Sequence, residues 1–138
     1  MRFSKRCQYG IKAAVCLAQH HGRGYLQSRT IAENEELPGK FLESILLALR
    51  SANILDSKVG AGGGYRLSRE PSQILVHEVV ETLNGVIEDE EMAVRASLTP
   101  GNASLAVMND RIDNALNEAL GGLSLGDLIE LAEQRARS

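Results

Sequence analysis

A run of glycines limits most tightly how this chain can fold. Residues 60–65 read Gly-Ala-Gly-Gly-Gly-Tyr and stand between two short stretches of mixed apolar and basic character, residues 54–59 and 66–69. Glycine accepts a positive φ in a tight hairpin and lets the backbone approach another surface closely. Because the run directly follows a strongly amphipathic helical pattern, it predicts the two-stranded wing of a winged helix.

A phosphate-binding loop is the main alternative for these glycines. A Walker loop requires Lys and Ser or Thr after its last glycine, and a dinucleotide loop requires a third glycine and then a helix. This chain has no such Lys, and Tyr65 stands where the third glycine would be. A plain glycine-rich turn remains the simpler alternative to a wing.

The chain's length allows one core-forming domain and a short appendage. It has 138 residues, and 43% of them are hydrophobic, which is too short for two full domains. No apolar run approaches the roughly 18 residues that span a bilayer, and no signal-peptide pattern is present. We therefore expect no membrane association and a cytoplasmic location.

Charge is distributed unevenly between the two halves. Residues 1–70 hold 11 Lys and Arg against 6 Asp and Glu, whereas residues 71–138 hold 4 against 12. The first half can face phosphates and the second is repelled by them. This asymmetry favours a DNA-binding head that carries an acidic association module, although accidental segregation of charge would produce it too.

Apolar periodicity predicts three helices before the wing, over residues 4–20, 28–34 and 38–51. Ser28 is a candidate N-cap of the second helix, and Pro38 suits the first turn of the third. The third helix is expected to bury five residues on one side: Phe41, Leu42, Ile45, Leu46 and Leu49. Its other side carries Lys40, Glu43, Ser44 and Arg50.

Two helices joined by a short turn, the second with a polar face, are the geometry that enters a DNA major groove. Lys40 can donate to guanine, Glu43 can accept from cytosine N4, and Ser44 can do either. The alternative is a solvated helix face that binds nothing.

Several motifs together resemble the Rrf2 family of bacterial transcription regulators. They are residues 1–5 with 9–11, residues 41–46 with Leu49 and Arg50, residues 62–67, and a helical segment over residues 74–85. The match covers about residues 1–85, with a weaker match beyond. The resemblance implies a mainly α-helical homodimer that binds a palindromic operator through two winged helix-turn-helix heads, with a C-terminal helix building the dimer.

The C-terminal part carries an apolar stripe that suits such an interface. Its members recur at spacings of three and four or flank that pattern: Leu105, Met108, Ile112, Ala115, Leu116 and Ala119. The pattern predicts dimerisation helices over residues 104–138, the last over residues 125–135, after an acidic loop at residues 86–103. Two heptads also allow the stripe to pack on the head of the same chain.

The best-known members of the resembling family hold an iron–sulfur cluster with three closely spaced cysteines. Here residues 86–104 contain no cysteine and no histidine, and the positions on the first helix where relatives supply a further ligand are Gln8 and Lys12. Such a cluster needs thiolate or imidazole ligands. We therefore expect no cofactor and no metal. Cys7 is expected in the core, whereas Cys16 suits the core, a dimer contact or a redox sensor.

No catalytic motif is present, so the chain is expected to be a regulator and not an enzyme. The most probable reading of the pattern is a repressor that binds double-stranded DNA. The phosphate candidates are Arg2, Lys5, Arg6, Ser28 and Arg29. The wing candidates are Lys58, Gly62, Gly63, Gly64, Tyr65 and Arg66.

Two departures from the family pattern leave a second function open. Val59-Gly60-Ala61 stands where many relatives have Arg-Gly-Pro, and Leu47 and Ala48 replace positions that are often polar or basic. The apolar pair suits either thymine methyl groups or another partner surface. The alternative is therefore a winged-helix dimer that binds a partner protein without strong DNA affinity; no effector is indicated.

Overall fold

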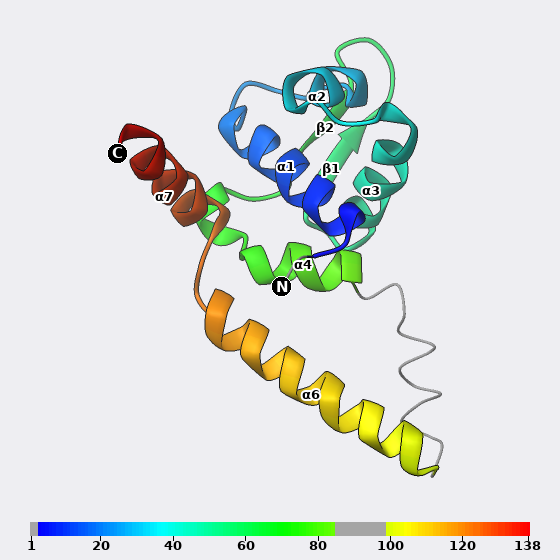
Figure 1. Ribbon diagram of the computed structural model, residues 1–138. Coiled ribbons are helices and arrows are strands. Elements are labelled where there is room, and N and C mark those ends of the chain that lie inside the picture. The colour runs from blue at the N-terminus through cyan, green and yellow to red at the C-terminus, as the bar shows by residue number, and fades with distance from the viewer. Residues whose placement is uncertain (1–2, 85–98) are drawn as a thin grey trace.

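The computed structural model describes residues 3–84 and 99–138, and Figure 1 shows a helical head above a long helix. The elements are, in order, α1 (Lys5–Gln19), α2 (Ser28–Glu35), α3 (Gly39–Ser51), β1 (Leu55–Lys58), β2 (Gly64–Leu67), the 3₁₀ turn η1 (Pro71–Gln73), α4 (Val76–Asn84), α6 (Pro100–Leu120) and α7 (Leu125–Arg137). The predicted mainly α-helical winged helix-turn-helix architecture is confirmed.

Helix α1 runs through the centre of the head and packs on α4. It begins after Ser4, whose Oγ accepts a hydrogen bond of 3.2 Å from the backbone N–H of Cys7, the bond expected of an N-cap. Gly10 faces α4 so closely that a Cβ there would clash with Leu83. The missing side chain thus lets the two helices approach, and α1 becomes the axis of the core.

The turn between α2 and α3 is built differently from the prediction at one point. Ser28 is the first residue of α2 and not its cap, because the N-cap is Gln27, which makes no side-chain capping bond. At the other end Glu36 adopts a left-handed conformation with φ of 55°. It turns the chain so that Leu37 is buried and α3 starts directly after Pro38.

Helix α3 buries Leu42, Ile45, Leu46 and Leu49 as predicted, but the prediction for Phe41 was wrong. The Phe41 side chain is 55% exposed, and the Lys40 ammonium lies 5.7 Å from its ring centroid. Phe41 stands in the first turn of α3, at the edge of the buried arc. The core ends there, so helical spacing alone assigned it to the wrong side.

The wing is a two-stranded antiparallel hairpin, as predicted. Leu55 pairs with Leu67 and Lys58 with Gly64, and the glycine-rich loop closes with a 3.0 Å hydrogen bond from the Gly63 N–H to the Gly60 carbonyl. Gly64 has a φ of 138°, and a Cβ there would meet the carbonyl of Leu26. The close approach is needed because Leu26 and Tyr65 exchange backbone hydrogen bonds of 2.8 and 2.7 Å, which tie the wing to the segment before α2.

Helix α7 packs against the head of its own chain. Ser124 and Asp127 form a capping box at its start, and Leu125 is fully buried with the head core. The Leu125 N–H donates to the carbonyl of Ile74 at 2.8 Å, and the Val76 N–H donates to the carbonyl of Leu123 at 2.9 Å. The C-terminal segment is therefore joined to the head on both sides of α6.

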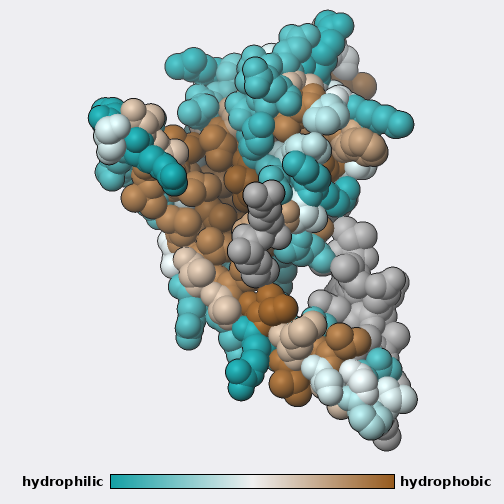
Figure 2. Space-filling view, in the orientation of Figure 1, coloured by the Kyte–Doolittle hydropathy of each residue, from teal (hydrophilic) through white to brown (hydrophobic). Residues whose placement is uncertain are grey.

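Helix α6 begins earlier than predicted, since Pro100 is already helical and Thr99 caps it. Residues 100–103 thus belong to the helix and not to the acidic loop, and residues 86–98 of that loop lie outside the described residues. None of the α6 residues is buried. Figure 2 shows a hydrophobic surface that runs from beside α7 along this helix. No helix in the described ranges is long and apolar enough to cross a membrane.

Candidate nucleic-acid interface

The wing, the start of α2 and the outer face of α3 enclose an open groove of about 690 Å³, here called the wing groove. The predicted site residues that line it are Ser28, Arg29, Glu43, Lys58, Gly63, Gly64 and Tyr65. It is lined further by Gln27, Leu47, Arg50, Ser57, Val59 and Gly60, which the sequence did not single out as site residues. Three segments far apart in the chain thus meet in one concave surface.

The predicted base-reading residues share one exposed face of α3. Lys40, Glu43 and Ser44 are all exposed. Ser44 Oγ donates to the carbonyl of Phe41 at 3.0 Å and accepts from Arg6 Nη1 at 3.3 Å. Arg6 therefore reaches across from α1 and adds a cation to the face that α3 presents.

Tyr65 departs from the role expected of a wing residue. Its side chain is only 7% exposed, and its hydroxyl donates a 2.8 Å hydrogen bond to Glu43 Oε1. Burial raises the pKa of Tyr65 to about 12, and the hydrogen bond to Glu43 and the charge of that carboxylate raise it further against the opposing effect of Arg50. Tyr65 is thus a protonated donor that orients Glu43 and does not itself face outward.

The basic residues of the wing gather around an aromatic ring that the sequence did not point to. The Arg66 guanidinium carbon lies 4.6 Å from the ring centroid of Tyr25, and the Lys58 ammonium lies 6.0 Å from it. Arg66 Nε also lies 3.7 Å from Asp56 Oδ2 across the hairpin. A cation over an aromatic face is held in place without losing its charge, so Tyr25 steadies both side chains.

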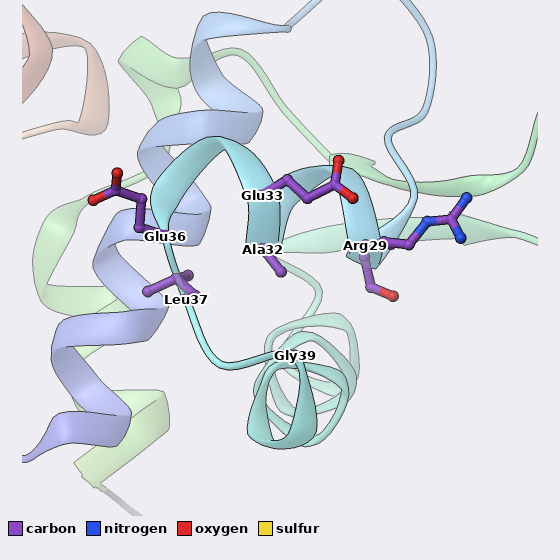
Figure 3. Close-up of a pocket in the computed structure, with 7 residues that line it drawn as sticks. Arg29, Ala32, Glu33, Glu36, Leu37 and Gly39 are labelled. Atoms are coloured by element: carbon purple, nitrogen blue, oxygen red, sulfur yellow. The ribbon is translucent and has the colours of Figure 1, made fainter.

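A second, shallower depression of about 490 Å³ lies on the other side of α2. In Figure 3, Ala32 and Leu37 form its apolar part beside the start of α3 at Gly39, while Glu33 and Glu36 extend from α2. Two carboxylates make this side unfavourable for a polyanion. Arg29 borders both hollows, and the wing groove is the one with cations on its walls.

The remaining predicted residues lie outside the groove. Arg2 is beyond the described residues, Lys5 is exposed in the first turn of α1, and Gly62 is exposed in the wing loop. The predicted dimer residues Leu105, Met108, Ile112, Ala115 and Ala119 are exposed on α6, and Leu116 is half-buried. The structure thus separates the stripe on α6 from the wing groove.

Both cysteines are buried in α1 and hold free thiols. Burial raises the pKa of the Cys7 thiol. Burial also raises the pKa of Cys16, where a 4.0 Å hydrogen bond from Asn34 lowers it and the charge of Glu35 raises it. A raised pKa keeps a thiol protonated and unreactive, so both cysteines pack as small core residues.

Comparison with known proteins decides the family. The family model described as "Rrf2: Iron-dependent Transcriptional regulator" matches residues 3–131. The chain belongs to the Rrf2 family. Among curated Rrf2-type relatives, the HTH-type transcriptional regulator CymR of Bacillus subtilis is 33% identical over 134 residues, covering 93% of this chain and 89% of that protein. IscR of Cereibacter sphaeroides is 28% identical over 137 residues, covering 98% and 84%.

Solved Rrf2 structures share the whole fold. IscR of T. potens superposes with a TM-score of 0.73 at 29% identity, covering 98% of this chain and 90% of that one. CymR, the global cysteine regulator of B. subtilis, superposes with a TM-score of 0.71 at 31% identity, covering 95% and 98%. These relatives are transcription regulators and not enzymes, so this Rrf2 chain is a DNA-binding transcription regulator with a winged-helix head.

The residues of this Rrf2 chain do not fit the iron–sulfur cluster that the family resemblance implies. Such a cluster requires several thiolates that converge. The chain has two cysteines, and both thiols are buried in the head core with raised pKa values. Within the described ranges no three His, Cys, Asp or Glu side chains gather as metal ligands. No step in DNA binding is therefore assigned to a cluster.

Proposed function

We propose that this protein represses transcription by binding a palindromic operator as a homodimer, with the wing groove and the outer face of α3 on the DNA. The observation that carries the proposal is the wing groove itself. Arg29 from α2, Arg50 from α3 and Lys58 from the wing line one concave surface. Three cations converging from separate elements suit the phosphate backbone, which supplies much of the affinity of such complexes.

Base reading falls to the exposed face of α3. Lys40 and Ser44 project from it, and Glu43 has one carboxylate oxygen bound to Tyr65. Its other oxygen, Oε2, is left to accept from cytosine N4, which is the pairing that a carboxylate makes in the major groove. A side chain whose orientation is fixed in advance loses less entropy on binding, so the bond from Tyr65 favours selective recognition.

Orientation on the DNA falls to residues that meet phosphates. Lys5 and Arg6 extend from the start of α1, and Arg6 lies close enough to Ser44 for a hydrogen bond of 3.3 Å. Ser28 and Arg29 stand in the first turn of α2, while Arg66 and Lys58 are steadied by Tyr25. Phosphate contacts of this kind set register without carrying sequence information.

Dimerisation falls to α6. Leu105, Met108 and Ile112 are between 37% and 50% exposed along one stripe of this helix. A contiguous apolar surface of this length is unusual on a monomer and marks an interaction site. A second copy of the chain can cover it and place two heads on two half-sites, which is how a dimer matches a palindrome.

A binding assay with a random duplex pool tests the proposal. We expect retained duplexes that share a palindromic motif, and an affinity that falls steeply between low and physiological salt. Arg29→Ala combined with Lys58→Ala should flatten the salt slope by up to about 0.9 per lost phosphate contact. The matched control is Arg135→Ala with Arg137→Ala in the last turn of α7, which removes the same charge outside the groove. An equal effect of both pairs would contradict the assigned surface.

One observation favours a second function, a protein-interaction module without strong DNA affinity. Val59, at the start of the wing loop, is 96% exposed, and Leu47 is 46% exposed in the same groove. Exposed apolar side chains are also typical of protein interfaces. In the same assay this function predicts no retained duplex at any salt concentration.

A further inference from the structure

Leu47 stands in the middle of the face of α3 that we place against DNA. It follows Lys40 by seven residues, Glu43 by four and Ser44 by three, and these spacings put all four side chains on one side of a helix. All four are exposed, and both Glu43 and Leu47 line the wing groove. The centre of the face is thus apolar, with polar side chains around it.

The fold does not need Leu47 for its core. Leu42, Ile45, Leu46 and Leu49 fill the buried side of α3. Leu47 points to the opposite side and is 46% exposed. It is also separate from the stripe on α6 that we assign to a second copy. Leu47 is therefore free to contact whatever occupies the wing groove.

The charges around Leu47 select the occupant. Arg29, Arg50 and Lys58 line the same groove, and the carboxylate of Glu43 is engaged by Tyr65. This arrangement favours a polyanion that also offers an apolar group. In the major groove of duplex DNA that group is the C5-methyl of thymine.

Resting on the proposed function, we infer that Leu47 contacts the C5-methyl group of one thymine in each half-site and so selects a thymine·adenine pair there. Leu47 lies one helical turn beyond Glu43, an advance of about 6 Å along α3. The thymine therefore lies within about two base pairs of the cytosine that Glu43 reads. A 5-methylcytosine offers the same methyl group and is accepted at this position if its other contacts are neutral.

Deoxyuridine tests this contact because it lacks only the methyl group of thymidine. Operators recovered from the random pool are resynthesised with each thymidine replaced singly, and Kd is measured for each. At one position per half-site we expect Kd to rise about fourfold, the value of burying one methyl group. The Leu47→Ala protein should bind the thymidine and deoxyuridine operators equally, whereas the matched control Val59→Ala should keep the discrimination.

Three results would overturn the inference. Equal affinity for thymidine and deoxyuridine at every position would show that no methyl group is read. Discrimination that survives in Leu47→Ala, with unchanged thermal unfolding, would assign the methyl group to another residue. Failure of the unaltered protein to retain any duplex would overturn the proposed function as well, which separates that outcome from the first two.

Discussion

The hydroxyl of Tyr65 in β2 donates a 2.8 Å hydrogen bond to Oε1 of Glu43 in α3. The two residues are 22 positions apart in the chain, and they join the wing to the helix that we place in the major groove. A hydrogen bond to a charged acceptor is stronger than one between neutral groups. The wing and the base-reading face are thus held in one fixed relationship before DNA arrives.

Tyr65→Phe should leave the fold intact and relax operator preference at one base pair. The change removes the donor without creating a cavity, so we expect a loss of about 1 kcal/mol of folding stability. Glu43 then becomes free to rotate, and its selectivity for cytosine should fall. Affinity measured on operators that vary only at that pair checks this. Tyr9→Phe, at a half-buried tyrosine of α1 outside the groove, is the matched control.

The same bond predicts how stability depends on pH at the alkaline end. Burial and the Glu43 carboxylate raise the pKa of Tyr65 from 10.0 to about 12 in the folded protein. The contribution is complete below the ordinary value, and it is lost as pH rises through the folded value because the unfolded chain ionises first. Denaturant unfolding should show the gap between the native protein and Tyr65→Phe narrowing from about pH 9 to about pH 12. A gap that stays constant across this range would contradict the prediction.

Lys40→Ala combined with Ser44→Ala should relax operator preference and leave nonspecific affinity nearly intact. Both side chains are exposed on α3 and face base edges in the proposed complex. Losing two base contacts should cost about 1–3 kcal/mol on the operator for each good bidentate pair removed. Competition between operator and random duplex measures the ratio. An equal loss on every sequence would mean that the two residues contact only phosphates.

Met108→Glu combined with Ile112→Glu should produce monomers that fold. Placing two carboxylates per chain in an apolar seam costs several kcal/mol, and Met108 and Ile112 are exposed in the single chain. The head core lies elsewhere, so circular dichroism should stay native and operator binding should fall with dimerisation. Asn114→Glu with Asn117→Glu, at exposed positions of α6 off the stripe, is the matched control. Sedimentation that still finds a folded dimer of the Met108 and Ile112 variant would place the interface elsewhere.

Anaerobically purified protein should be colourless and lack stoichiometric iron. Residues 86–104 contain no cysteine and no histidine, and burial raises the pKa values of the thiols of Cys7 and Cys16. Visible absorption together with iron and acid-labile sulfide assays checks this. Integral stoichiometry of iron and sulfide would contradict the prediction and would require unusual ligands.

Local sequence patterns determined the helices, the wing and the family of this protein. Apolar spacing predicted α1, α3 and α6 because a helix repeats every 3.6 residues, and the glycines at positions 60–64 predicted the hairpin because positive φ and close backbone approach suit glycine. These are constraints between near neighbours, which a sequence shows directly.

Only the tertiary structure decided which side chains meet. It exposed Phe41 at the edge of the core, bonded Tyr65 to Glu43, brought Arg6 to Ser44 and placed Arg66 over Tyr25. Each of these pairs depends on the packing of elements far apart in the chain, and no local periodicity records that packing. The sequence named most members of the wing groove, but their arrangement as one surface follows from how α2, α3 and the wing pack on α1 and on one another.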